Sequence, residues 1–163
     1  MFKVSFKETP NKPFRVVTKA GRETTVILRG TVRMPDFWHH MPMEIVDWIG
    51  NRTRIEGYED IVNNTIIIYS TGKAKCMEGD TYNSLLGERI AESRAKYYIY
   101  KFIYDLCQRL YSYYAGIAIG NATSVINTAD GNNCIAQDIS KYKGLCIREA
   151  HHLGELLNSN GNG

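Results

Sequence analysis

The sequence contains no apolar segment of the roughly 18 to 20 residues that a membrane-spanning helix needs. Its start holds no continuous apolar run either, so we expect no signal peptide. The four cysteines form no C-x-x-C pair, and without a secretory signal they are best explained as reduced thiols of a cytosolic protein. These absences argue against a membrane protein and against a secreted disulfide scaffold, and they favour a cytoplasmic location.

The sequence also has little excess charge and none of the common catalytic motifs. Its formal net charge of +3 is below the strongly basic balance of a nucleic-acid-binding domain, which makes nucleic acid a disfavoured partner. No P-loop, G-x-G-x-x-G or G-x-S-x-G motif is present. The doublets His39-His40 and His151-His152 lack the i, i+4 spacing of a helical zinc site. We therefore predict that the protein is not an enzyme, and we expect no metal and no cofactor.

Short alternating or β-branched segments fill the first half of the chain and predict strands. The clearest is residues 65–69, Thr-Ile-Ile-Ile-Tyr, which Ser70 to Gly72 should end before a further short strand at 73–76. Ala20-Gly21-Arg22 predicts a hairpin turn. The other predicted strands lie at residues 2–6, 14–17 and 24–28.

Helical spacing dominates the second half. An uninterrupted pattern from Ser84 to Ala115 predicts one helix of about 32 residues with an apolar stripe on one face. A second helix is predicted over 138–157 with Asp138 as its N-cap, and residues 116–133 fit either a loop or a continued helix. The stripe consists of Ile99, Phe102, Ile103, Leu106, Leu110, Tyr113 and Ile117.

Strands followed by helices predict an α+β fold: an N-terminal antiparallel sheet, then one very long helix and a second C-terminal helix. We expect a single domain over residues 1–157, with strands in 1–77 around an insertion at 34–60 that has one short element at 44–49. Residues 82–157 should be helical, and 158–163 should form a disordered tail.

The long helix should exceed the body of the protein. At 1.5 Å per residue it would span roughly 48 Å, whereas a compact chain of this size is only about 40 Å across. Its apolar side chains would then lie in water on a single protomer. We therefore predict a homo-oligomer in which a second subunit covers the long helix.

The junction between the last strand and the long helix gathers groups that can bind an anion. A helix start favours negative charge, arginine and lysine bind phosphate, and an aromatic ring can stack on a base. In the alternative interpretation the lysines are merely solvated and the arginines pair with Glu88 and Glu92. The candidate ligand-binding residues are Lys73, Lys75, Tyr82, Asn83, Arg89 and Arg94.

The same junction resembles a known family. The pattern consists of Gly72-x-Ala74-x-Cys76, Asp80-x-Tyr82, Gly87, Ile90-Ala91 and Arg94-Ala95. It is similar to small phage proteins of the Thoeris anti-defence sponge family, the first described type, although Tyr82 stands where that family has Phe. The resemblance implies an oligomer of sheet and long helix that sequesters cyclic ADP-ribose isomers or, in some members, cyclic oligonucleotides. By motif position it assigns ligand binding to Tyr82, Arg89 and Arg94.

The leading hypothesis is therefore a phage protein in the cytoplasm of a bacterial host. It would bind a cyclic nucleotide signalling molecule without altering it and so starve an immune effector. One alternative is a nucleic-acid-binding phage accessory protein that uses the same basic and aromatic groups. Another is a structural or partner-binding phage protein in which the long helix only holds an assembly together.

Overall fold

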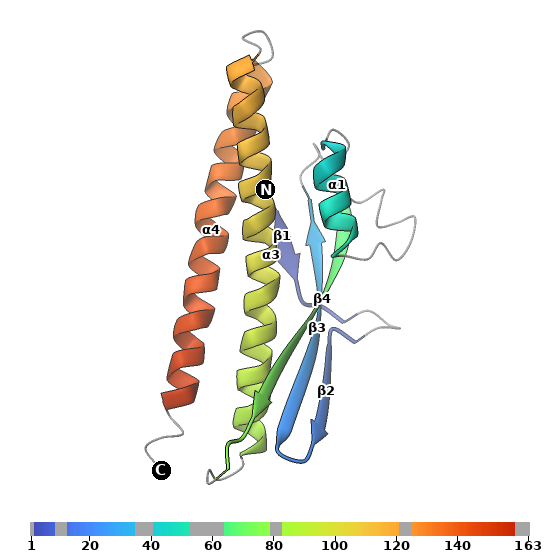
Figure 1. The fold of residues 1–163 in the computed structure, drawn as a ribbon, viewed down its shortest axis with the longest axis vertical. Coiled ribbons are helices and arrows are strands. Elements are labelled where there is room, and N and C mark those ends of the chain that lie inside the picture. The colour runs from blue at the N-terminus through green and yellow to red at the C-terminus, as the bar shows by residue number, and fades with distance from the viewer. Residues whose placement is uncertain are drawn as a thin grey trace.

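The computed structural model describes residues 2–8, 13–34, 41–52, 64–78, 83–120 and 125–158, and of residues 117–120 and 125–132 it describes only the backbone. An antiparallel sheet built from the first half of the chain packs against a long helical hairpin built from the second half (Figure 1). This confirms the predicted α+β order of a sheet followed by a long helix and a C-terminal helix.

The sheet is organised around β3 (Glu23–Arg33). Strand β4 (Thr65–Lys75) pairs with β3 along its whole length, while β1 (Lys3–Ser5) and β2 (Arg15–Ala20) share the other side of β3. The turn from β2 to β3 places Gly21 at a φ of 57°, a conformation that glycine adopts without strain. The predicted hairpin turn is confirmed.

Strand β4 is continuous, so the predicted break at 70–72 is wrong. Alternate residues of this strand are buried beneath the long helix, as expected for a sheet with one covered face. Ser70, Gly72 and Ala74 lie on that buried face, where small side chains leave room for the helix. The small residues therefore reflect close packing and not the end of the strand.

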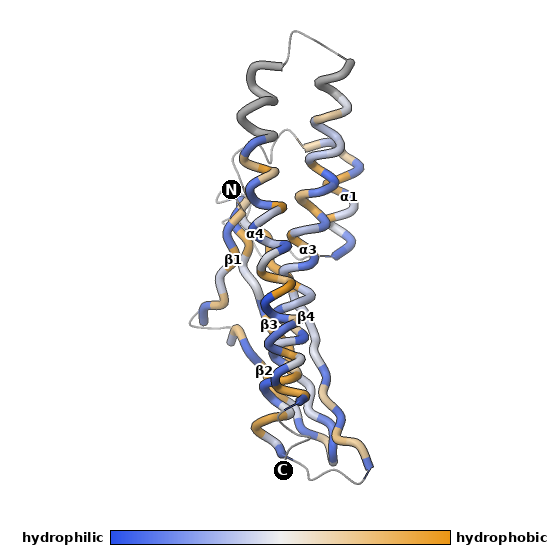
Figure 2. The backbone as a smooth tube through the Cα atoms, turned by 90° about the vertical axis from the view of Figure 1, so that its left-hand side faces the viewer, coloured by the Kyte–Doolittle hydropathy of each residue, from blue (hydrophilic) through white to orange (hydrophobic). Residues whose placement is uncertain are grey.

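The two long helices, α3 (Ser84–Gly120) and α4 (Val125–Asn158), run antiparallel, and α3 lies between α4 and the sheet (Figures 1 and 2). Four residues of the predicted stripe have no exposed surface: Ile99, Ile103, Leu106 and Leu110. The sheet and α4 of the same chain cover them. A second subunit is thus not needed to bury these four residues, although Tyr113 of the same stripe is 38% exposed. The homo-oligomer stays a prediction, and the buried part of the stripe does not support it.

Several boundaries differ from the sequence-based expectation. Helix α4 begins at Val125, so Asp138 lies within it and the predicted N-cap at Asp138 is wrong. Most of 116–133 is helical, since α3 runs to Gly120 before α4 begins. Helix α1 (Met43–Gly50) matches the short element predicted at 44–49. The rest of the predicted insertion, apart from Met34, 41–42 and 51–52, and the tail from 159 onward lie outside the described residues.

The start of the chain is fastened to the middle of α4. The backbone N–H of Phe2 donates to Oδ2 of Asp138 at 2.8 Å, and the hydroxyl of Tyr142 donates to the carbonyl oxygen of Phe2 at 2.9 Å. All three residues are at least 99% buried. These bonds connect β1 to the helical hairpin and explain why an acidic residue is tolerated inside the packed face of α4.

Candidate functional site

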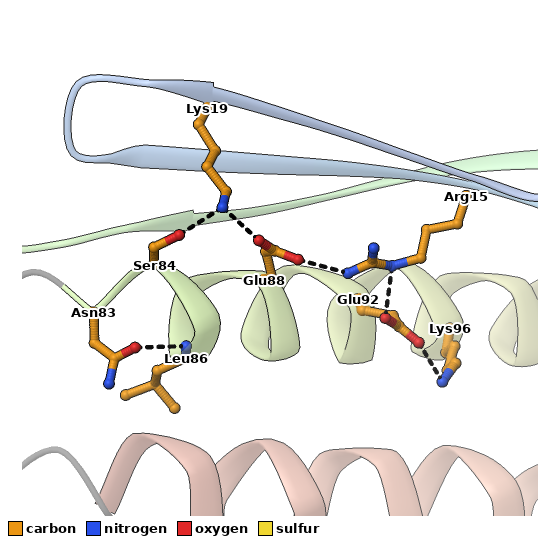
Figure 3. A network of polar contacts seen from close by, with 8 residues as sticks. All are labelled: Arg15, Lys19, Asn83, Ser84, Leu86, Glu88, Glu92 and Lys96. Atoms are coloured by element: carbon orange, nitrogen blue, oxygen red, sulfur yellow. Dashed lines mark hydrogen bonds and ion pairs between the residues drawn. The ribbon is translucent and has the colours of Figure 1, made fainter.

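The predicted site lies where β4 passes the first turns of α3. The sequence placed six candidate residues there, of which the structure describes five, since Tyr82 lies outside the described residues. Asn83 acts as the N-cap of α3, because its side-chain Oδ1 accepts the backbone N–H of Leu86 at 3.0 Å (Figure 3). Its side-chain oxygen thus already serves the helix, and only the amide nitrogen is left for another partner.

The pairing of β4 with β3 leaves the backbone carbonyl of Lys73 pointing outward, where Arg94 can reach it. The backbone N–H of Cys76 donates to the carbonyl oxygen of Arg22, which makes Arg22 and Cys76 a hydrogen-bonded pair at the end of the ladder. By alternation, Lys73 opposite Thr25 belongs to a non-hydrogen-bonded pair, so its backbone groups point away from β3. The guanidinium Nη1 of Arg94 donates to this outward-facing carbonyl oxygen of Lys73.

The side chain of Lys73 has an acidic neighbour within the sheet. Its Nζ lies 3.3 Å from Oε1 of Glu23 on β3, and both side chains are substantially exposed. An exposed pair of this kind contributes little binding energy and leaves the lysine accessible. Lys73 therefore meets Arg94 through its backbone oxygen, while its charged side chain lies on the exposed face of β4, opposite to Gly72 and Ala74, which pack against α3.

Arg89 and Lys75 are exposed, and neither makes an ion pair or hydrogen bond to the part of the chain that the structure describes. Arg89 precedes Arg94 by five residues, which corresponds to about 140° around a helix. The two arginines consequently point in different directions. The structure joins Arg94 with Lys73 but does not bring Arg89 to the same point.

The acidic residues at the start of α3 pair with β2 and not with these arginines (Figure 3). Glu88 lies 3.0 Å from Nη2 of Arg15 and 2.5 Å from Nζ of Lys19. The hydrogen bond from Lys19, followed by that from Arg15, lowers the pKa of Glu88. The alternative interpretation, in which Arg89 and Arg94 pair with the glutamates of this helix, is therefore wrong for Glu88.

Glu92 also pairs with cations other than Arg89 and Arg94. Its carboxylate lies 2.9 Å from Nε of Arg15 and 2.7 Å from Nζ of Lys96. Burial alone would raise the pKa of Glu92, but the hydrogen bond and charge of Lys96, together with Arg15, outweigh it and lower the pKa. Because both glutamates are neutralised by other cations, Arg94 keeps its positive charge for a ligand.

Arg94 also lines a cleft of about 230 Å³ between the two long helices. Two tyrosine rings lie beside it on α3, Tyr97 and Tyr98, with ring centroids 5.8 Å apart and planes at 71°. Helix α4 contributes the other wall through Glu149, Ala150 and Leu153. The cleft thus combines a guanidinium, two aromatic rings and a carboxylate.

Apart from Arg94, none of the residues that line this cleft is among the candidates predicted from the sequence. Tyr97 and Tyr98 follow Arg94 at i+3 and i+4, so helical spacing alone could have placed them on one face. The residues of α4 gave no such signal. Their position depends on how the hairpin closes, which no local pattern reveals.

A second, more open groove of about 880 Å³ lies between α1 and the middle of α3. Its walls carry both charge signs, including Glu44, Asp105 and Arg109. The guanidinium of Arg109 lies 4.8 Å from the ring centroid of Trp48, so it is engaged in holding α1. None of the candidate residues lies in this groove.

The described residues include no group of three or more His, Cys, Asp or Glu side chains placed to hold a metal ion. Among the helices that the structure describes, none is both long and apolar enough to cross a membrane. Comparison with known proteins found no matching family model, curated protein or solved structure. Any functional assignment therefore depends on the geometry of the site and on the short motif described above.

Proposed function

We propose that this protein binds a cyclic nucleotide signalling molecule without chemical change and so sequesters it, as in the phage anti-defence sponges that its motif resembles. The observation that carries the proposal is the cleft in which Arg94 lies beside Tyr97 and Tyr98. A guanidinium can hold a phosphate through two parallel N–H···O bonds, and a tyrosine ring can stack on a base. A phosphate and a base are the two kinds of group that every nucleotide offers.

Neighbouring charges support the same ligand class. Arg94 contacts the backbone of Lys73, and the side chains of Lys73 and Lys75 share the exposed face of β4 that is turned away from α3. Both lysines are exposed and lie outside the cleft, so they can add to the general positive field that attracts an anion, while Arg94 makes the directed contact. Arg89 points elsewhere and would contribute only to the general positive field.

Isothermal titration against a panel of cyclic ADP-ribose isomers, cyclic dinucleotides and cyclic trinucleotides tests the proposal. We expect at least one member to bind with a Kd below about 1 μM, which corresponds to about 8 kcal/mol. The ligand recovered after heat denaturation should have an unchanged mass. A panel without any binder of this affinity contradicts the proposal, and a changed mass contradicts sequestration.

Two substitutions test whether the ligand binds in the cleft. Tyr98→Ala removes a ring that is 56% exposed, so the fold should persist while affinity falls roughly tenfold through lost stacking. Arg94→Ala should weaken binding by at least about tenfold, because it removes a charge-assisted contact. Matched controls are Tyr111→Ala on α3 and Arg148→Ala on α4, which lie outside the residues that line the cleft. Equal losses in variants and controls would show that the ligand binds elsewhere.

A further inference from the structure

Glu149 gives the cleft a carboxylate in a fixed orientation. The hydroxyl of Ser93 donates to its Oε2 at 2.9 Å and also reaches the backbone oxygen of Glu149 at 3.4 Å. Ser93 is 3% exposed, whereas Glu149 is half-buried, so the contact is shielded from water on the serine side. Within the described residues no hydrogen bond or ion pair reaches the other carboxylate oxygen, Oε1. Glu149 therefore keeps acceptor capacity in a wall of the cleft that Arg94 also lines.

The size of the cleft limits what enters it. Pockets that enclose a whole small-molecule ligand usually measure about 300 to 1,000 Å³, and this one measures about 230 Å³. It therefore has room for a single ring system and not for a complete cyclic dinucleotide. In a nucleotide bound here, one base would enter between the tyrosines and α4, and the sugar-phosphate would remain at the mouth near Arg94.

A carboxylate distinguishes between the bases by their hydrogen-bonding edges. Guanine presents two adjacent donors, N1–H and the N2 amino group, which match the two oxygens of a carboxylate. Adenine and cytosine present one amino group beside a ring nitrogen acceptor, and uracil presents one N–H between two carbonyl oxygens. An acceptor facing a carboxylate is repelled, so only guanine satisfies both oxygens.

We infer that the cleft is a guanine-binding site in which Glu149 reads the base edge, Tyr97 or Tyr98 stacks on the base, and Arg94 contacts a phosphate. This inference rests on the proposed function and narrows it to guanine-containing cyclic nucleotides, which excludes the cyclic ADP-ribose isomers because their base is adenine. It makes Glu149 the residue that determines specificity and Ser93 the residue that positions it.

Titration with matched nucleotides tests the inference. GMP and AMP carry the same phosphate, as do cyclic di-GMP and cyclic di-AMP, so each pair differs only in the base. We expect the guanine compound of each pair to bind at least about tenfold more tightly, because adenine can form at most one of the two charge-assisted hydrogen bonds and turns a ring-nitrogen acceptor toward the other carboxylate oxygen. Inosine monophosphate, which keeps N1–H but lacks the amino group, should bind with an intermediate affinity.

The variant Glu149→Gln supplies the test from the protein side. The amide can still accept from Ser93 but presents one acceptor and one donor to the base, which match the amino group and ring nitrogen of adenine. Guanine binding should therefore weaken, AMP binding should strengthen, and the guanine-to-adenine ratio should fall below about two. Glu155→Gln is the control, since it removes the same charge from an exposed position of α4 outside the cleft. The ratio should survive in this control.

The outcomes separate this inference from the proposed function. If cyclic nucleotides bind but the guanine and adenine compounds bind equally in the wild type, the guanine assignment is overturned while the sponge proposal stands. A guanine preference that persists in Glu149→Gln also overturns it, because another group then reads the base. If no nucleotide binds at all, both proposals fail. The comparison in the wild type needs no variant, so poor folding of Glu149→Gln would not leave the question open.

Discussion

A Cβ atom added to Gly72 of β4 would lie 1.8 Å from the carbonyl oxygen of Ala91 on α3. The strand and the helix therefore touch through their backbones at this point, with Ala91 and Ala95 on the helix side. This contact explains much of the family-like motif: Gly72, Ala74, Ala91 and Ala95 are small because the two elements pack so closely. It also determines the point along the edge of β4 at which Arg94 lies.

The contact predicts that Gly72→Ala is severely destabilising. The new methyl group would overlap backbone atoms of the helix, which cannot rotate aside as a side chain can. We expect a loss on the order of 3 kcal/mol in the free energy of unfolding, measured by urea denaturation. Gly144→Ala is the matched control, because its added methyl group meets open space in the middle of α4 and alanine favours a helix by up to about 1 kcal/mol. Similar effects of the two changes would contradict the close contact.

The core of the hairpin gives a second prediction. Leu106 has no exposed surface, so Leu106→Ala should cost about 2 to 5 kcal/mol through lost burial and a residual cavity. Leu85, on the same helix, is 72% exposed, and Leu85→Ala should change stability by less than about 0.5 kcal/mol. Thermal or chemical denaturation followed by circular dichroism measures both. If Leu106→Ala were as mild as Leu85→Ala, the packing of α3 between α4 and the sheet would be wrong.

The sequence predicted the classes and order of these elements better than their limits. The apolar stripe of α3 was visible because helical periodicity is local, and four of its seven residues are completely buried. The continuity of β4 was not visible, since Gly72 resembles a strand breaker until the helix that packs against it is known. Asp138 resembles an N-cap in the sequence because its actual partner, the backbone N–H of Phe2, lies 136 residues away and has no local signal.

The candidate site was predicted only in part, and again the reason is distance along the chain. The nearness of Arg94 to Lys73 followed from the short connection between strand and helix. The neutralisation of Glu88 by Arg15, 73 residues earlier, and the approach of Glu149 to Ser93, 56 residues away, depend on tertiary packing. A single sequence contains no local pattern for either contact.

The buried carboxyl of Asp138 predicts an unusual pH dependence. Burial raises the pKa of Asp138, although the hydrogen bond from Phe2 opposes this effect, and its Oδ1 atom has no hydrogen-bond partner among the described residues. The folded chain then takes up a proton more readily than the unfolded chain. The destabilising charge is therefore fully present above the folded pKa and disappears as the pH falls toward the ordinary aspartate value near 4.

Asp138→Asn isolates this effect, because the amide oxygen can still accept the N–H of Phe2 but cannot ionise. We expect the free energy of unfolding of the variant, relative to wild type, to be more favourable at pH 7 than at pH 4. Urea denaturation at a series of pH values measures the difference. A difference that stays constant across that range would show that the carboxyl titrates alike in the folded and unfolded chains.

The attachment of α1 gives the last prediction. The ring of Trp48 stacks on Phe102 of α3 with centroids 5.1 Å apart and planes at 14°, and the guanidinium groups of Arg52 and Arg109 lie 4.7 and 4.8 Å from its centroid. Trp48→Ala should therefore increase amide hydrogen exchange in residues 43–50 at least about tenfold, since aromatic and cation–π contacts each contribute roughly 1 kcal/mol. Exchange in the core of β3 should change little, because that strand is held by its ladder to β4 and by α3. Equal increases in both segments would mean that α1 and the sheet open as one unit, and Trp48 would then stabilise the whole fold and not one docked helix.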